Sequence, residues 1–465
     1  MKAQFLKIFV KIRSSLWFTP GVMSSVAVAL AFLTITMNDP MADFFESLGW
    51  TFSGGAEGAS AVLKTIAGSM ITIAGVVFSI TLVALSLVTS QLGPRLLRNF
   101  MRDTTTQVVL GTFVATFLYC LIVLRTVRRS DSSGDTEFVP HLSVTLGVFF
   151  AVLSVGVLIY FIHHVSVSIQ ANRVVARVGN ELLTTIDHLY PKKPAKDTPQ
   201  KEERPSADFL DMFSRKSRPV PATTDGYIQF IDKEVLMEWA VKEDAVIRLE
   251  QQPGRYIVAG QPLVRIWPED KITDQLPKRI NRAFALDDER TPSQDVEFAV
   301  LELVEIALRA LSPSLNDPFT AIACIDQLGT ALCRLAQRNI PSPYLFDEGK
   351  QLRIIAPTRG FSEITDAAFN QIRHNVRSSV QIFIHLLDTI ATVAYFAHRP
   401  EDQATLLRHA EMLVRGAREG LPEELDRWVV EERYQAVVRL CNEPRPGLEQ
   451  DIDRQPNANE TSLVS

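Results

Sequence analysis

The chain has 465 residues, of which 46% are hydrophobic and 22% charged, and its formal net charge is −5. A chain without a basic surplus lacks the electrostatic footprint of a nucleic-acid-binding protein, so we expect no nucleic-acid partner. Its four cysteines are scattered without a CxxC pair, which argues against a disulfide scaffold or a zinc ribbon.

Four apolar stretches before residue 165 are long enough to cross a bilayer core of about 30 Å as helices. They are Leu16–Met37, Thr65–Thr89, Gln107–Leu124 and Leu142–Ile162. These runs predict an N-terminal arm over 1–15 and a four-helix transmembrane domain over 16–164. Four buried core helices of a globular protein are the weaker interpretation, because soluble chains rarely repeat uncharged runs of this length. No signal-peptide cleavage site follows the first run closely, so it is expected to stay as an anchor.

Lysine and arginine in short loops indicate the orientation of these spans. The N-terminal arm carries four basic residues, and the loop after the second span carries three. In the loop after the first span, every charged residue before Lys64 is acidic. This pattern predicts that both termini lie in the cytoplasm. The arginines after the third span, Arg125, Arg128 and Arg129, count against it.

The second span carries small and hydroxylated residues on one side. On a helical projection they fall within about 120° of arc. They are Thr65, Gly68, Ser69, Thr72, Gly75, Ser79, Ser86 and Ser90. Such a stripe is typical of close helix packing in lipid. Alternatively, it lines a pore that several subunits assemble.

Charged residues are absent from the interiors of all four spans. Ion-coupled carriers usually place ionisable groups at the middle of the membrane, so this absence favours a passive channel over a carrier. His163 and His164 follow the fourth span, where they either flank the membrane surface or act as a pH sensor or metal ligands.

The fourth span is predicted to continue into the cytoplasm over 165–190, because apolar residues keep helical spacing there. A proline-rich, charged linker over 191–219 follows. From 220 to 270 the period changes to two, with strands expected at Tyr227–Ile231 and Ala245–Leu249, which indicates a small β barrel or sandwich module. The spacing of its Gly and Pro residues is similar to that of biotinyl/lipoyl modules. Their Met-Lys-Met hairpin is missing, so we expect no attached cofactor.

Helical periodicity predicts a helical cytoplasmic domain over 276–441 and a disordered tail over 442–465. Thr291 and Gln294 are spaced as a capping box for its first long helix, and Asp317 with Pro318 marks the start of the next. Further helices are expected at Phe361–His374, Ser378–His398, Glu401–Glu419 and Glu423–Leu440.

The segment between the first two helices of this domain has two interpretations. Its key residues are Ser312, Pro313, Asn316, Asp317 and Pro318. They suit a tight helix–helix corner with a capped restart, or, with Glu305, a ligand or ion site. No P-loop, GxGxxG, GxSxG or HExxH motif occurs in the chain, so we expect no enzyme activity and no metal.

Several separate blocks resemble one family in the same order. They include Gly54–Ala59, Val76–Thr81, Ser90–Arg95 and Ala310–Ala321. Together they resemble the predicted bacterial membrane proteins called Domain of Unknown Function 2254. The resemblance implies a bacterial inner-membrane protein with four N-terminal spans, and it implies no activity.

Two functional hypotheses remain. In the first, the chain is an oligomeric passive ion channel or pore, lined by the second span and assembled or gated by the cytoplasmic part. In the second, it is a membrane-anchored scaffold or stress sensor without transport activity. Both make the lipid bilayer a partner. A homo-oligomer is expected from the first hypothesis, and a cytoplasmic protein partner from the second.

Overall fold

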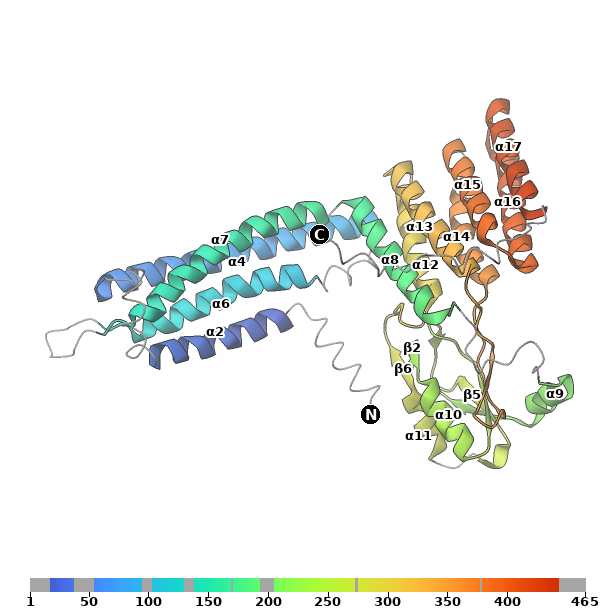
Figure 1. The fold of residues 1–465 in the computed structure, drawn as a ribbon, viewed down its shortest axis with the longest axis horizontal. Coiled ribbons are helices and arrows are strands. Elements are labelled where there is room, and N and C mark those ends of the chain that lie inside the picture. Colours follow the sequence, from blue (N-terminus) through green and yellow to red (C-terminus); the bar gives the residue numbers. More distant parts are fainter. Residues whose placement is uncertain are drawn as a thin grey trace, which may run out of the picture.

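A computed structural model of the chain describes residues 17–36, 54–93, 103–128, 138–168, 170–192, 205–271, 275–376 and 379–442. Long helices form a bundle at one end of the molecule, and shorter helices with two small sheets form a separate part at the other end (Figure 1). The predicted N-terminal arm and the predicted tail beyond residue 442 lie outside the described residues, as do most of the loops that indicate orientation.

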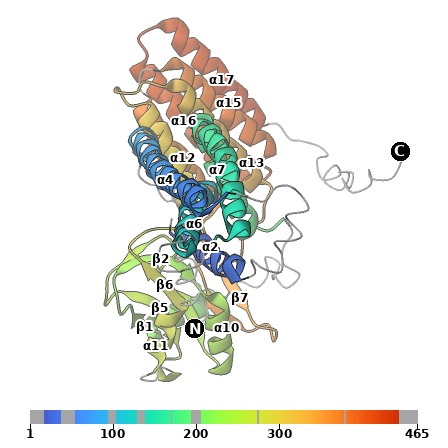
Figure 2. The same ribbon diagram turned by 90° about the vertical axis from the view of Figure 1, so that its left-hand side faces the viewer.

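Four helices make up the bundle: α2 (Phe18–Thr36), α4 (Ala56–Leu92), α6 (Thr104–Thr126) and α7 (His141–Ser168). α6 packs against the other three, and the four run roughly side by side when seen near end-on (Figure 2). Phe113, Tyr119 and Phe161 are fully buried between them. Alanines such as Ala31 and Ala67 are buried beside these rings and allow the helix backbones to approach closely.

Buried polar side chains of the bundle bond to one another. The hydroxyl groups of Thr34 and Tyr119 lie 3.1 Å apart, and the Ser143 hydroxyl donates to Thr34 Oγ1 at 3.0 Å. The Tyr119 hydroxyl also donates to the Ser143 carbonyl at 3.2 Å. These bonds link α2, α6 and α7, because an unpaired polar group is costly where no water can reach it.

Five described helices, not four, are long and apolar enough to cross a membrane. The additional one is α13 (Pro318–Ala336), the least apolar of the five. It packs against α8, α12 and α15 and buries residues on several sides, among them Cys324, Leu328 and Leu332. The prediction of only four such helices was wrong. A helix that other helices surround needs apolar residues on most of its sides, so its composition resembles that of a membrane span.

α7 does not continue unbroken into the part of the molecule that contains the shorter helices and the sheets. It ends at Ser168, and a separate helix, α8 (Ala171–Leu189), starts three residues later and turns away from the bundle (Figure 1). Because α8 is amphipathic, it packs its apolar face, with Val175, Leu182 and Ile186 buried, onto the shorter helices that follow it in the chain. The predicted extension over 165–190 is therefore helical, but it is divided between the end of α7 and α8.

The helical domain contains α8 and six further helices around one core. Besides α13 these are α12 (Val296–Ala310), α14 (Phe361–Asn375), α15 (Val380–Phe396), α16 (Pro400–Gly420) and α17 (Glu424–Asn442). The four helices predicted after residue 360 are confirmed within a few residues at each end.

The start of α12 differs from its prediction. Asp295, not Thr291, caps the helix, and its carboxylate accepts the Phe298 N–H at 3.2 Å. Gln294 instead bonds the backbone of Ile231, with its Oε1 accepting the N–H at 2.9 Å. The predicted capping box at Thr291 and Gln294 was wrong. The Gln294 side chain bonds Ile231 instead, and Asp295 directly precedes the first residue of α12.

Two sheets form the β module. The five-stranded sheet has the order β1-β5-β3-β8-β7, and the three-stranded sheet has the order β4-β2-β6. Their bounds are β1 (Arg218–Pro221), β2 (Gly226–Ile231), β3 (Val246–Leu249), β4 (Tyr256–Ile257), β5 (Pro262–Trp267), β6 (Phe284–Asp287), β7 (Tyr344–Phe346) and β8 (Leu352–Ile355). β8 pairs with β3 in parallel. The module thus takes strands from well beyond the predicted 220–270.

Three helices accompany these sheets: α9 (Ala207–Lys216), α10 (Lys233–Lys242) and α11 (Leu276–Ala283). α10 and α11 bury Leu236, Trp239 and Ile280 in the core of the module. α9 and β1 occupy the second half of the segment predicted as a linker over 191–219, because Phe213 supplies a buried anchor there. Residues 193–204 of that segment lie outside the described residues.

Candidate functional site

The two sides of α4 have different surroundings. One side is buried: Leu63, Ala67, Met70, Ala74 and Val77 pack into the bundle, and Val88 packs into the helical domain. The stripe predicted to line a pore or an interface lies on the opposite side, and all eight residues are exposed: Thr65, Gly68, Ser69, Thr72, Gly75, Ser79, Ser86 and Ser90. The bundle of one chain therefore leaves this stripe on its outer surface.

Most hydroxyl groups of the stripe bond to α4 itself. Those of Thr65, Ser69, Thr72 and Ser79 each donate to the carbonyl four residues earlier, at 2.8 to 2.9 Å. Such bonds satisfy a hydroxyl group without an outside partner. The stripe can therefore face lipid or another helix without leaving these groups unpaired.

The glycines of the stripe leave the helix backbone accessible. No heavy atom lies within 4 Å of the position that a Cβ on Gly68 or Gly75 would occupy. A second helix could therefore approach α4 closely along this side, as small residues allow in membranes.

α4 extends well past the bundle. Its 37 residues make a helix of about 55 Å, whereas the bilayer core is about 30 Å thick. Val77 is its last residue in a core of the bundle, and Leu92 belongs to the core of the helical domain. Between them, Leu82, Val83 and Leu87 are 49%, 69% and 44% exposed. Apolar side chains so exposed require lipid or protein to cover them.

The end of α4 is held by α12. The Arg309 guanidinium donates to the Ser90 carbonyl at 3.2 Å and lies 3.6 Å from the Glu305 carboxylate. This contact pairs a cation with a carbonyl that the helix end leaves free. Gly93 ends the helix with φ 121°, and a Cβ there would lie 2.7 Å from Glu305 Oε1. α4 and α12 therefore meet at a position that only glycine fits.

His164 contributes to a contact at the same end of the bundle. Its Nε2 lies 2.9 Å from the Asp103 carboxylate, which also caps α6 by accepting the Thr105 N–H at 3.3 Å. Among the described residues, no group of three or more His, Cys, Asp or Glu side chains could hold a metal ion. The pair links α7 to α6, and a pH-sensing role stays a prediction.

A family model described as a predicted membrane protein, DUF2254, matches residues 13–392. The chain belongs to this family. The resemblance inferred from the sequence blocks is thereby confirmed.

Relatives of this DUF2254 chain occur in mycobacteria. It is 32% identical over 383 residues to the uncharacterized proteins Rv1290c and MT1328 of Mycobacterium tuberculosis strains H37Rv and CDC 1551, and to Mb1321c of Mycobacterium bovis. The match covers 82% of this chain and 72% of each relative. No solved structure matches the chain. These relatives carry no activity that could be transferred.

The segment from Ser312 to Pro318 lies between α12 and α13 of this DUF2254 protein. Asp317 caps α13, accepting the Thr320 N–H at 3.1 Å, and Pro318 is the first residue of that helix. Asn316 has φ 47°, which asparagine tolerates in a tight turn. Ser312 Oγ donates to the Arg309 carbonyl at 2.6 Å, and Pro313 follows it within the turn. The Asp317 carboxylate thus serves the fold by capping α13, and a ligand or ion site that includes Glu305 stays a prediction.

The contact between α4 and α12 was missed by the sequence analysis. Gly93 before Pro94 is a recognisable helix stop. Arg309, however, looks like an ordinary basic residue in the last turn of a soluble helix. Only the fold shows that it reaches the end of the transmembrane helix.

Proposed function

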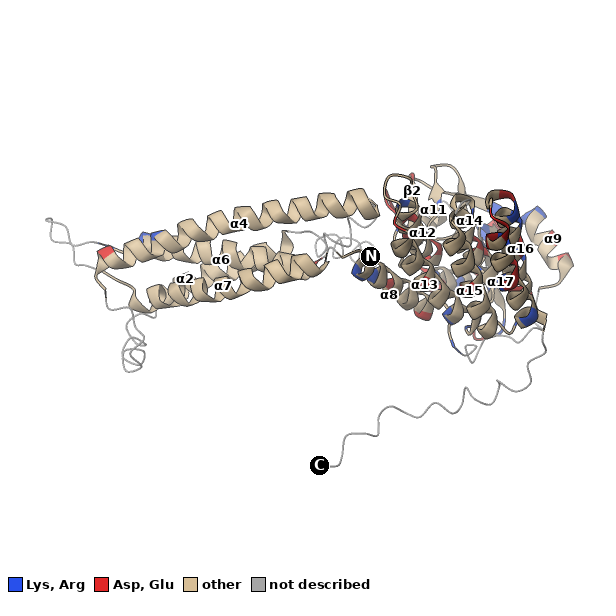
Figure 3. Ribbon diagram, turned by 90° about the horizontal axis from the view of Figure 1, so that it is seen from above, with Lys and Arg blue, Asp and Glu red and all other residues tan. Residues whose placement is uncertain are grey.

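We propose that this protein is an integral inner-membrane protein in which α2, α4, α6 and α7 span the membrane, while α13 stays within the helical domain. The bundle is almost free of charge and the other part carries both signs (Figure 3). Thr19 near the start of α2 bonds Gln107 near the start of α6 at 2.7 Å. Both helices therefore start at the end of the bundle where α7 leads into α8. This arrangement supports both termini in the cytoplasm.

We further propose that several copies assemble around α4 into a passive pore. The outward position of the stripe supports this, because one bundle cannot enclose a path along it. The exposed Leu82, Val83 and Leu87 follow Val77, the last residue of α4 in a core of the bundle, and neighbouring copies would cover them. Absence of charge within the spans fits passive conduction better than ion-coupled transport.

The cytoplasmic part would assemble or gate the pore through the end of α4. Leu92 and Val88 are buried in the helical domain, and Arg309 holds the Ser90 carbonyl. A movement of α12 would therefore displace α4 directly. No other described transmembrane helix contributes buried residues to the core of this domain.

A membrane-anchored scaffold or stress sensor is the second candidate, and one observation favours it. The stripe hydroxyls that donate to their own helix offer ions only their lone pairs. Close packing of a neighbouring helix requires only that the side chains of the stripe are small. In this case a cytoplasmic protein partner would bind the helical domain.

Cysteine cross-linking tests assembly around α4. In a background with Cys333→Ser and Cys441→Ser, Ser79→Cys should form disulfide-linked dimers in membranes. Val152→Cys, which lies on α7 and outside the stripe and is 67% exposed, should not. Absence of dimers from Ser79→Cys would remove the assembly on which the pore depends.

Single-channel recording in planar bilayers then separates the two candidates. A pore predicts conductance that Ser79→Phe and Ser86→Phe block and Val152→Phe leaves unchanged. Cross-linking without conductance would favour the scaffold. Conductance that ignores both stripe substitutions would refute the proposed lining.

A further inference from the structure

A polar cleft of about 610 Å³ lies between the β module and the helical domain. The loop after β3, residues 250 to 255, forms one wall, and the starts of α12 and α14 form the other. Its size is that of a site for a small molecule. Nothing in the proposed pore uses this cleft.

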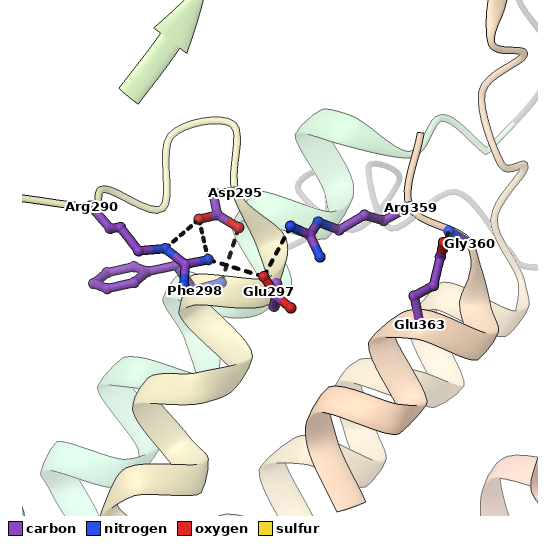
Figure 4. A network of polar contacts seen from close by, with 7 residues as sticks. All are labelled: Arg290, Asp295, Glu297, Phe298, Arg359, Gly360 and Glu363. Atoms are coloured by element: carbon purple, nitrogen blue, oxygen red, sulfur yellow. Dashed lines mark hydrogen bonds and ion pairs between the residues drawn. The ribbon is translucent and has the colours of Figure 1, made fainter. Parts of the chain in front are cut away.

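One wall of the cleft is a fixed network of charges (Figure 4). Arg290 Nη2 donates to the Asp295 and Glu297 carboxylates at 2.6 and 3.1 Å. Arg359 reaches the same Glu297 oxygen from the loop before α14, at 2.9 Å. The side chain of Arg359 is only 14% exposed, so this guanidinium is held in place rather than solvated.

Four carboxylates line the cleft, and each uses one oxygen within the fold. These oxygens are Glu250 Oε1, bound by Arg248; Glu297 Oε2, bound by Arg290 and Arg359; Glu363 Oε2, bound by the Gly360 N–H; and Asp366 Oδ1, bound by Arg408 and His409. Across the described part of the chain, the second oxygen of each has no hydrogen-bond partner. These second carboxylate oxygens are therefore available as hydrogen-bond acceptors for a ligand in the cleft.

Arg255 lines the cleft from the wall opposite Glu297, Glu363 and Asp366. Its side chain is exposed and forms no ion pair with any described residue. The neighbouring Gly254 fixes the loop, because its N–H donates to the Ile228 carbonyl at 2.7 Å and its φ is 86°. A Cβ on Gly254 would lie 1.8 Å from Asp295 Oδ2, so the loop approaches α12 as closely as glycine permits. Arg255 is thereby positioned at the cleft.

The charges around the cleft nearly balance. Five carboxylates, Glu250, Asp295, Glu297, Glu363 and Asp366, are accompanied by six arginines, Arg248, Arg255, Arg265, Arg290, Arg359 and Arg408. A polyamine or a divalent cation would meet two guanidiniums, and a phosphate would meet four carboxylates. A ligand that carries both signs suits this lining best.

We propose that the cleft binds a small zwitterion of the amino-acid class, with its carboxylate on Arg255 and Arg359 and its ammonium group on Glu363 and Asp366. Guanidinium and carboxylate form strong paired hydrogen bonds. Glu363 and Asp366 are three residues apart on α14 and so share one side of the helix. Asn370 and Gln252 add amide groups to the lining.

Isothermal titration of the full-length protein in detergent, with each of the twenty amino acids in turn, tests this proposal. We expect saturable binding of at least one of them. Arg255→Gln should weaken that binding about tenfold to a hundredfold, because a charge-assisted contact is lost. Glu363→Gln should do likewise, and a glutamine can still bond the Gly360 N–H, so the cap of α14 is kept.

Arg218→Gln provides the matched control, because Arg218 is exposed on the same module and does not line the cleft. It should bind as the unchanged protein does. Failure of all twenty amino acids to bind at millimolar concentration would overturn the proposal. So would binding of inorganic phosphate that Arg255→Gln weakens, or of spermidine that Glu363→Gln weakens, while amino acids do not bind. Neither outcome bears on the pore, which is judged by conductance.

Discussion

Replacing Gly93 with alanine tests the contact between the end of α4 and α12 of the helical domain. Gly93 has φ 121° and ψ 152°, a region that essentially only glycine adopts. Holding alanine there costs about 1–3 kcal/mol. The new methyl group would also collide with Glu305 Oε1, 2.7 Å from its position. The docked end of α4 should therefore open about 5 to 150 times more often.

Hydrogen exchange measured by mass spectrometry detects this opening locally. Amides near the end of α4 and in the last turn of α12 should lose protection by that factor, whereas those of α6 should not. Gly156→Ala is the control, because Gly156 lies in α7 with no heavy atom within 4 Å of an added Cβ. Unchanged exchange in Gly93→Ala, or an equal change in Gly156→Ala, would refute the assignment of Gly93 as the required residue.

Three further predictions concern other parts of the chain. Gly254→Ala should lower the unfolding temperature, because its Cβ would lie 1.8 Å from Asp295 Oδ2; calorimetry that shows no change would contradict this contact. Burial lowers the pKa of His409 despite the adjacent Asp366, with Arg408 and Arg373 acting in the same direction as burial. As the pH falls below the ordinary histidine pKa of about 6.5, this histidine binds a proton in the unfolded chain more readily than in the folded chain, which favours unfolding. The unfolding temperature should therefore rise with pH up to that value. His409→Gln should flatten this rise, and a slope that survives the substitution must come from other groups. Val83→Lys should leave the helix content unchanged and reduce the oligomer to monomers in light scattering, because Val83 is 69% exposed in one chain; an oligomer of unchanged mass would place the contact elsewhere.

Features that depend on neighbouring residues could be predicted from the sequence. α14 spans Phe361–Asn375 and was expected at Phe361–His374, because its start and its apolar period are local signals. Asp317 and Pro318 mark the start of α13 for the same reason. β2 and β3 lie where short runs of apolar and β-branched residues predicted strands.

Features that depend on distant residues could not be predicted. β8 is four residues long and pairs with β3, and so short an apolar run carries no period that distinguishes strand from helix. Gln294 was expected to cap α12, but it bonds Ile231 in the β module. The cleft likewise brings together Arg255 and Asp366, which belong to different parts of the fold, so no local motif announces it.

The choice between the two sides of α4 shows why a stripe of small residues is ambiguous in sequence. Alanines line the side that packs into the bundle, and serines, threonines and glycines line the opposite side. Both sides permit close helix contact, so residue size does not tell which of them the bundle uses. The bundle takes the alanine side, and most hydroxyl groups on the other side bond to their own helix. The remaining side can therefore face lipid or a second copy of the chain without burying those groups unpaired, so the cross-linking of Ser79→Cys decides which of the two covers it.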